Sequence, residues 1–225
     1  MFITLDGSDG CGKSTQKKRL GFCFQSQGYE VVLCRDPGST TLGNEIRRIL
    51  LHSHELRIDN KTEMLLFMAA RAQMVEEIIR PALNMGKIVI SDRFLLSNYV
   101  YQGYAGGIPL DILETVGPIA VEGLTPDLAI ILDIPYEIAV KRIENRNESD
   151  RMEQKGETYH RQVRNGFLQY AAIHPDRYVI IDAVPPPEKV EQSIRNVIYE
   201  RYGIDFSFPV EEPKVGVKDI KDDRN

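Results

Sequence analysis

The sequence predicts an α/β fold in which helices cover both faces of a parallel sheet of five strands. Five short apolar runs rich in β-branched residues lie at 2–5, 30–34, 87–91, 128–133 and 177–181, separated by segments long enough to form helices. Near-continuous apolar strands that alternate with helices are typical of a parallel sheet buried on both sides. A chain of 225 residues buries one sizeable core, so we expect a single domain.

The first apolar run leads into a glycine-rich segment, GSDGCGKS at 7–14. It fits the pattern G-x-x-x-x-G-K-[ST] of a phosphate-binding loop, and it lies between a predicted strand and a predicted helix. In such a loop, backbone N–H groups surround a polyphosphate, Lys13 reaches the outer oxygens and the Ser14 hydroxyl binds Mg²⁺. The predicted nucleotide-binding residues of this segment are Gly7, Ser8, Asp9, Gly10, Cys11, Gly12, Lys13, Ser14 and Thr15.

Helices are expected between the strands, at 14–27, 41–52, 61–84, 136–146, 157–173 and 187–202. The longest opens at Asn60, and Glu63 three residues later gives a start that resembles a capping box. Pro118 interrupts the apolar pattern of 111–124, which predicts a kink or two short helices there. The segment from Asp205 is charged and interrupted by prolines, so we place the domain at 1–204 and leave 205–225 as a tail of unassigned role.

Composition disfavours several classes of partner and location. The net charge of −5 argues against nucleic acid, so any basic site is local, as a small phosphorylated ligand requires. The three cysteines form no C-x-x-C pair, and we find no signal peptide, which indicates reduced thiols in a cytoplasm. No stretch approaches the ~18 apolar residues of a membrane span. We therefore expect a soluble, cytoplasmic protein without a membrane partner.

The segments after the loop disfavour two large classes of phosphate-loop protein. A GTPase reads its base with N-K-x-D, whereas 60–63 read NKTE and precede a helix. A motor-type ATPase ends a strand with an acidic pair that holds Mg²⁺ and activates water. Here Asp92 is followed by Arg93 at the end of the third strand. A guanidinium at the carboxyl edge of the sheet favours a second phosphorylated substrate, with a surface salt bridge as the alternative.

Five segments then resemble motifs of the thymidylate kinase family, in the family's order. They are RDPG at 35–38, LFMAAR at 66–71, SDRFLLSNYVYQG at 91–103, GLTPDL at 123–128 and DRME at 150–153. The match covers about residues 1–200, and the five motifs together are highly specific. The resemblance implies a P-loop kinase fold with strand order 2-3-1-4-5 and a mobile lid at about 145–155.

The resemblance also implies an activity: ATP and dTMP give ADP and dTDP, with Mg²⁺, in the synthesis of dTTP. It implies catalytic roles for Asp9, Lys13, Arg93, Arg146 and Arg151, and it places Arg142 beside adenine. The resemblance assigns the binding of Mg²⁺ to Ser14 and Asp92, directly or through water. The implied dTMP site comprises Asp9, Arg35, Pro37, Phe67, Arg71, Arg93, Ser97, Asn98, Tyr101 and Gln102. The family is typically homodimeric.

Physical chemistry supports several of these roles. Phe67 and Arg71 are four residues apart on a predicted helix, so the ring stacks on a base while the guanidinium donates to a carbonyl such as thymine O4. A core phenylalanine beside a snorkelling arginine is the alternative. Asn98 offers the thymine imide both a donor and an acceptor. Tyr101 crowds the 2′ position of the sugar, and Asp9 either orients the acceptor or caps the loop.

Phosphoryl transfer needs positive charge at the equatorial oxygens, yet this phosphate loop contains no arginine. Some family members carry arginine where Gly10 stands, and others place basic residues in the lid. The arginines that flank and occupy 145–155 resemble the second, bacterial-type arrangement, with a solvated helix end as the alternative.

The sequence departs from the family pattern at Asp6, Cys11 and Ser39, where the family usually has Glu, Ala and Gly. Glycine at the last position permits a positive φ that serine adopts less readily. Tyr99 and Val100 also differ from the commonest residues, which bears on thymine selectivity. Two alternatives to the kinase of dTMP stay open: a deoxynucleoside kinase, whose acceptor lacks a phosphate for Arg93, and a catalytically silent nucleotide-binding module.

Overall fold

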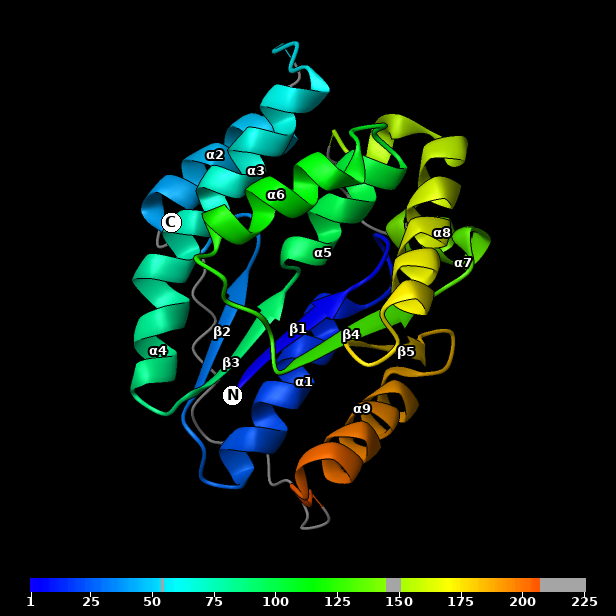
Figure 1. The fold of residues 1–225 in the computed structure, drawn as a ribbon. Helices are drawn as coiled ribbons and strands as arrows, with labels where there is room; N and C mark the ends of the chain where they lie inside the picture. The colour runs from blue at the N-terminus through cyan, green and yellow to red at the C-terminus, as the bar shows by residue number, and fades with distance from the viewer. Residues whose placement is uncertain (54, 145–150, 207–225) are drawn as a thin grey trace.

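The computed structural model describes residues 1–53, 55–144 and 151–206, and its centre is a five-stranded sheet (Figure 1). The strands are β1 (Phe2–Asp6), β2 (Val31–Arg35), β3 (Ile88–Asp92), β4 (Leu128–Asp133) and β5 (Tyr178–Asp182). They lie in the order β2-β3-β1-β4-β5, and every neighbouring pair is parallel. The predicted sheet and its strand order are confirmed.

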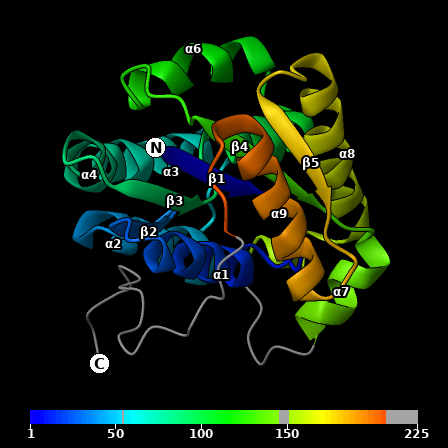
Figure 2. The same ribbon diagram turned by 90° about the horizontal axis from the view of Figure 1, so that it is seen from below.

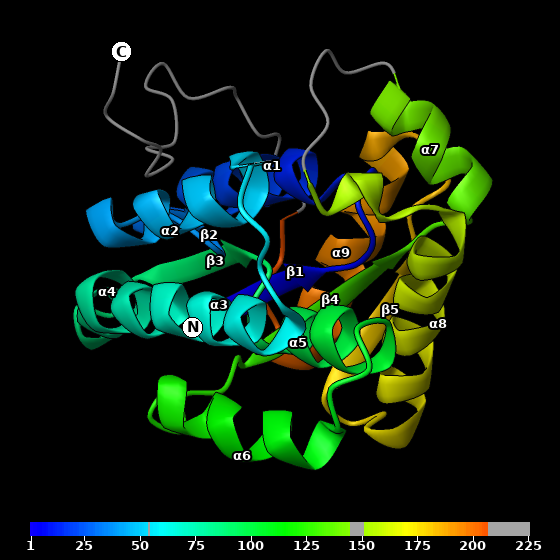
Figure 3. The ribbon, with the colours of Figure 1, turned by 90° about the horizontal axis from the view of Figure 1, so that it is seen from above.

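Helices cover both faces of the sheet (Figures 1 and 2). One face carries α1 (Lys13–Ser26) and α9 (Pro187–Tyr202), which pack against each other. The other face carries α3 (Asn60–Met74), η1 (Val75–Ile79), α4 (Arg80–Asn84), α5 (Leu95–Asn98), η2 (Tyr99–Tyr104) and α8 (Glu157–Ile173). Around these lie α2 (Thr41–His52) and α6 (Leu110–Ala120), both packed on α3, and α7 (Tyr136–Glu144), packed on α8 (Figure 3). The short η3 spans Glu153–Lys155.

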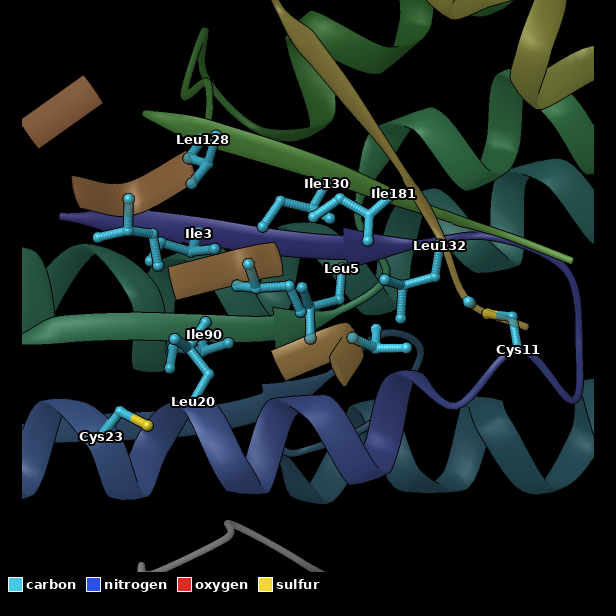
Figure 4. Packing of buried hydrophobic residues seen from close by; sticks show 14 of the residues in the cluster. Ile3, Leu5, Cys11, Leu20, Cys23, Ile90, Leu128, Ile130, Leu132 and Ile181 are labelled. Atoms are coloured by element: carbon cyan, nitrogen blue, oxygen red, sulfur yellow. The ribbon is translucent and has the colours of Figure 1, made fainter. Parts of the chain in front are cut away.

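The core lies on both sides of the central strand. Ile3 and Leu5 of β1 belong to the cluster that includes Leu20 of α1 (Figure 4). Phe2 points to the opposite face, where its ring meets Phe94 edge-on with 5.0 Å between centroids. All five side chains are at most 2% exposed. Burial of one such side chain stabilises the fold by about 1.5–3 kcal/mol, so the central strand is firmly fixed and its carboxyl end holds a defined position.

The long helix predicted at 61–84 is interrupted by the π-helical turn η1. Pro81 follows within two residues; it has no N–H to donate, and its ring crowds the carbonyl of the preceding turn, which favours a wider turn there. The predicted cap was wrong by one residue. Asp59 caps α3, because its Oδ1 accepts from the N–H groups of Lys61 and Thr62, whereas Asn60 donates from its side chain to Gly106 O.

Three other expectations concern segment ends. Of the two alternatives for 111–124, two short helices is wrong and the kink stays a prediction: α6 is one helix that contains Pro118, which has no N–H to donate to the preceding turn, and the helix ends two residues later at Ala120. The described part of α7 ends at Glu144, and the predicted residues 145–150 of the lid lie outside the described residues. Phe206, in the expected tail, is buried against Phe24 with 5.1 Å between centroids. No described helix has the length and apolar character needed to cross a membrane.

Candidate functional site

The phosphate loop joins the end of β1 to the start of α1 and makes close backbone contacts. Gly7, Gly10 and Gly12 have φ values of 136°, 80° and 98°, which favour glycine. A Cβ on Gly7 would lie 2.5 Å from Leu132 O, and one on Gly10 would lie 2.6 Å from Ala139 O. The loop therefore fits against β4 and α7 only with glycine at positions 7 and 10. An arginine at position 10 does not fit this packing, so positive charge must come from other segments.

Lys13 and Ser14 begin α1 at this loop. Lys13 Nζ donates to Gly7 O at 3.1 Å and to Ser8 O at 2.8 Å, so the ammonium group lies over the loop. Ser14 Oγ donates to Asp92 Oδ2 at 2.8 Å. A hydroxyl and one carboxylate fit Mg²⁺, which prefers few protein oxygens together with water and phosphate. Among the described residues, no cluster of three or more His, Cys, Asp or Glu forms a fuller metal site.

Arg93 connects the end of β3 to the phosphate loop. Its φ of 72° is unusual for a residue other than glycine, and such strain is tolerated where the surroundings fix it. Its Nη1 donates to Gly7 O at 2.9 Å and to Ser97 Oγ at 3.1 Å. Its Nη2 donates to Asp9 Oδ1 at 2.5 Å and to Tyr101 Oη at 2.9 Å. Tyr101 Oη in turn donates to Asp9 Oδ2 at 2.9 Å.

The charges of this cluster define its protonation. Burial raises the pKa of Asp9, but the positive charges of Arg93 and Lys13 and the hydrogen bond from Tyr101 outweigh it and hold the pKa well below its ordinary value. Burial raises the pKa of Tyr101 well above its ordinary value, and the Asp9 carboxylate adds to the shift. Asp9 is therefore an ionised acceptor, and Tyr101 keeps its proton as a donor.

An open cavity with roughly 520 Å³ of empty space lies beside this cluster. Nine residues of the predicted dTMP site line it: Asp9, Pro37, Phe67, Arg71, Arg93, Ser97, Asn98, Tyr101 and Gln102. Leu51 and Met152, which sequence analysis did not single out, close part of its wall. The cavity thus joins residues of six separate segments at the carboxyl edge of the sheet.

Arg71 is held on the wall of this cavity by a buried ion pair. Its side chain is 1% exposed, and its Nε donates to Asp36 Oδ2. Burial raises the pKa of Asp36, while the Arg71 charge opposes the shift. Asp36 is a residue that sequence analysis assigned no role. Truncation of either partner leaves a buried charge uncompensated, which typically costs about 3–5 kcal/mol.

Arg35 is the one residue of the predicted dTMP site that does not line this cavity. It lines a second space, with roughly 700 Å³ of empty volume, together with Lys13, Ser14 and Asp92. Its Nε is buried and has no hydrogen-bond partner among the described residues. Arg47 of α2, which no quoted motif contains, lines both cavities and donates to Pro37 O at 3.0 Å. Two guanidinium groups therefore border the region between the phosphate loop and the first cavity.

The predicted lid arginines have distinct positions. Arg142 of α7 donates to Ala183 O and Val184 O, both at 3.1 Å, so it packs on the segment between β5 and α9. Arg151 donates from Nη2 to Glu63 Oε2 at 2.5 Å and from Nε to Leu50 O at 2.7 Å. Arg146 lies outside the described residues.

The family model described as Thymidylate kinase matches residues 5–194. The chain belongs to the thymidylate kinase family. This confirms the family predicted from the five motifs.

Individual relatives support the same assignment. A thymidylate kinase from Thermoanaerobacter sp. (strain X514) is 43% identical over 197 residues, which cover 88% of this chain and 96% of the relative. One from Pseudomonas fluorescens (strain SBW25) is 43% identical over 194 residues, 86% and 92% of the two chains. The crystal structure of thymidylate kinase from Ehrlichia chaffeensis matches with a TM-score of 0.70 and 31% identity, and covers 88% of this chain and 98% of that one.

Two departures from the thymidylate kinase pattern have a local structural account. Asp6 is shorter than glutamate by one methylene; its Oδ1 accepts from Ser97 Oγ at 2.7 Å, and its buried Oδ2 has no partner among the described residues. Ser39 has a φ of 69°, the conformation for which the family uses glycine. Its Oγ accepts from Arg35 N–H at 2.9 Å and donates to Arg35 O at 3.3 Å, and Asn44 Oδ1 accepts from its N–H at 3.1 Å. These hydrogen bonds stabilise the positive φ.

We expect Ser39→Ala to destabilise the fold more than Ser39→Gly does. Alanine loses the hydroxyl and keeps the left-handed strain, so the loss is about 1–3 kcal/mol, whereas glycine loses the same bonds but relieves a strain of about 1–2 kcal/mol. Urea unfolding of the two variants and the wild type gives the three free energies. A glycine variant that is less stable than the alanine variant would contradict this account of the loop.

Proposed function

We propose that the chain phosphorylates dTMP to dTDP with ATP as donor, in the synthesis of dTTP. The observation that carries this proposal is the Arg93 cluster, which joins the phosphate loop to the acceptor cavity through Gly7, Asp9 and Tyr101. A guanidinium at this junction lies where an acceptor phosphate and the transferred group have to meet. Membership of the thymidylate kinase family supports the same activity.

The two alternatives are not favoured. A deoxynucleoside kinase takes an acceptor without a phosphate, and the family match is to kinases of a monophosphate. A silent nucleotide-binding module has no need of a second cavity beside the phosphate loop, whereas this chain has one lined by Phe67, Arg71 and Asn98.

We propose that separate side chains bind the base, the sugar and the phosphate end of dTMP. Phe67 stacks on the thymine, Arg71 donates to O4, and Tyr101 limits space at the sugar 2′ position. Asp9 orients the acceptor as a carboxylate. Because its pKa is held low, it is a weak base, which suits phosphoryl transfer, since this reaction depends mainly on alignment and charge.

On the donor side, the loop amides and Lys13 bind the ATP phosphates, and Arg142 lies beside adenine. Ser14 and Asp92 would hold Mg²⁺, directly or through water, and the ion would supply positive charge toward the phosphates. We retain Arg146 and Arg151 as the arginines that reach the transferring group, so Arg151 must exchange its bond to Glu63 for a phosphate oxygen. The homodimer, the requirement for Mg²⁺ and the cytoplasmic location stay predictions.

Release of ADP from Mg-ATP, measured with different acceptors, tests the function directly. We expect dTMP to support the fastest turnover and thymidine to support almost none, because thymidine lacks the phosphate that Arg93 binds. Comparable turnover with thymidine would favour the deoxynucleoside kinase. No turnover with any acceptor would favour the silent module.

A second test concerns the metal. Asp92→Asn should raise the Mg²⁺ concentration needed for half-maximal turnover, because an amide oxygen carries no net charge toward the cation while the bond from Ser14 is retained. Titration of turnover with MgCl₂ at fixed ATP measures the shift, and we expect about tenfold. Asp176→Asn, at an exposed position, is the matched control and should leave the titration unchanged. An unaltered titration for Asp92→Asn would remove this residue from the metal site.

A further inference from the structure

Behind the acceptor cavity, three buried side chains form a continuous chain of hydrogen bonds. Asn98 Nδ2 donates to Gln102 Oε1 at 3.0 Å, and Gln102 Nε2 donates to Glu63 Oε1 at 3.0 Å. The three residues are at most 3% exposed. Glu63 lies on α3, while Asn98 and Gln102 lie one helical turn apart on α5 and η2. We refer to Glu63, Gln102 and Asn98 as the amide relay.

The inner end of the relay has a fixed polarity. Glu63 is ion-paired with Arg151 at 2.5 Å and with Lys155 at 3.1 Å. A carboxylate only accepts hydrogen bonds. The Gln102 side chain must therefore turn its NH₂ group toward Glu63 and its oxygen toward Asn98. Asn98 must then donate from its own NH₂ group to that oxygen. The chemistry of one carboxylate thus sets the orientation of both amides.

The outer end of the relay faces the base site. Asn98 lines the acceptor cavity together with Phe67 and Arg71. With its NH₂ group bonded to Gln102, the oxygen Oδ1 remains, and within the described part of the chain no donor bonds it. The group presented to a base is therefore an acceptor. Thymine offers a donor at N3, whereas cytosine offers a lone pair at N3, which an acceptor repels.

We propose that Glu63 is a positioning residue for base recognition, which acts through Gln102 to hold Asn98 Oδ1 toward the cavity and so favours thymine over cytosine. This inference rests on the proposed function and adds the origin of the base preference. Glu63 touches no substrate in this scheme. Buried groups built to bond one partner reject an analogue that leaves them unpaired, which is the usual source of strong discrimination.

Glu63→Gln tests the relay, because an amide at position 63 reverses its polarity. Arg151 and Lys155 attract the new amide oxygen, so the NH₂ group turns toward Gln102. Gln102 and Asn98 then turn in sequence, and Asn98 presents a donor to the base. We expect the ratio of dTMP to dCMP affinity, measured by calorimetry without ATP, to fall by about tenfold. Arg71 still favours thymine O4, so part of the preference remains.

Two further variants make the result decisive. Lys155→Gln removes one cation but keeps the carboxylate and its ion pair with Arg151, so the ratio of dTMP to dCMP affinity should stay close to that of the wild type. Thermal unfolding shows whether each variant folds. Gln102→Met breaks the relay at its second residue and should lower the ratio of dTMP to dCMP affinity, so it tests the relay independently of whether Glu63→Gln folds. A wild-type chain that binds both nucleotides equally would overturn the proposed acceptor. A wild-type preference that persists in folded Glu63→Gln or Gln102→Met would overturn the relay alone.

Discussion

The structure depends above all on the bonds that Arg93 makes at the carboxyl edge of the sheet. One guanidinium binds a carbonyl of the phosphate loop, the Asp9 carboxylate and the Tyr101 hydroxyl. The loop follows β1, Arg93 follows β3 and Tyr101 lies on η2, so the cluster fixes three segments relative to one another. The proposed donor and acceptor sites adjoin because the parallel order β3-β1 brings these strand ends together.

Charge around this cluster is arranged for recognition more than for stability. Asp36 holds Arg71, Glu63 holds Arg151, and both pairs are largely buried. Buried ion pairs often contribute little net stability, because desolvation offsets their attraction. Here the ion pairs act mainly on orientation, because a carboxylate only accepts hydrogen bonds and neighbouring side chains must turn their donor groups toward it. In the proposed function, the same reasoning links the amide of Asn98 to Glu63, and the low pKa of Asp9 to alignment of the acceptor.

Much of the fold was predictable from sequence because the core strands are nearly continuous apolar runs, such as 128–133, and the loop pattern fixed where β1 ends. The misassigned details depend on alternatives of similar local energy. Asp59 and Asn60 are both good caps, and only packing decides between them. Arg47 belongs to no quoted motif, and Glu63 was considered only as part of a capping box; both contact segments distant in sequence. Ser39 adopts the glycine-like conformation through hydrogen bonds that sequence alone does not reveal.

A crystal structure with bound dTMP tests the central role of Arg93 most directly. The account predicts that a phosphate oxygen of dTMP lies within hydrogen-bond distance of the Arg93 guanidinium, with the base against Phe67 and its N3 at Asn98 Oδ1. The carboxylate of Asp9 should remain beside Arg93 as a fixed partner. A complex in which the dTMP phosphate lies away from Arg93, while Arg93 keeps only its bonds to the phosphate loop, Asp9 and Tyr101, would contradict the account.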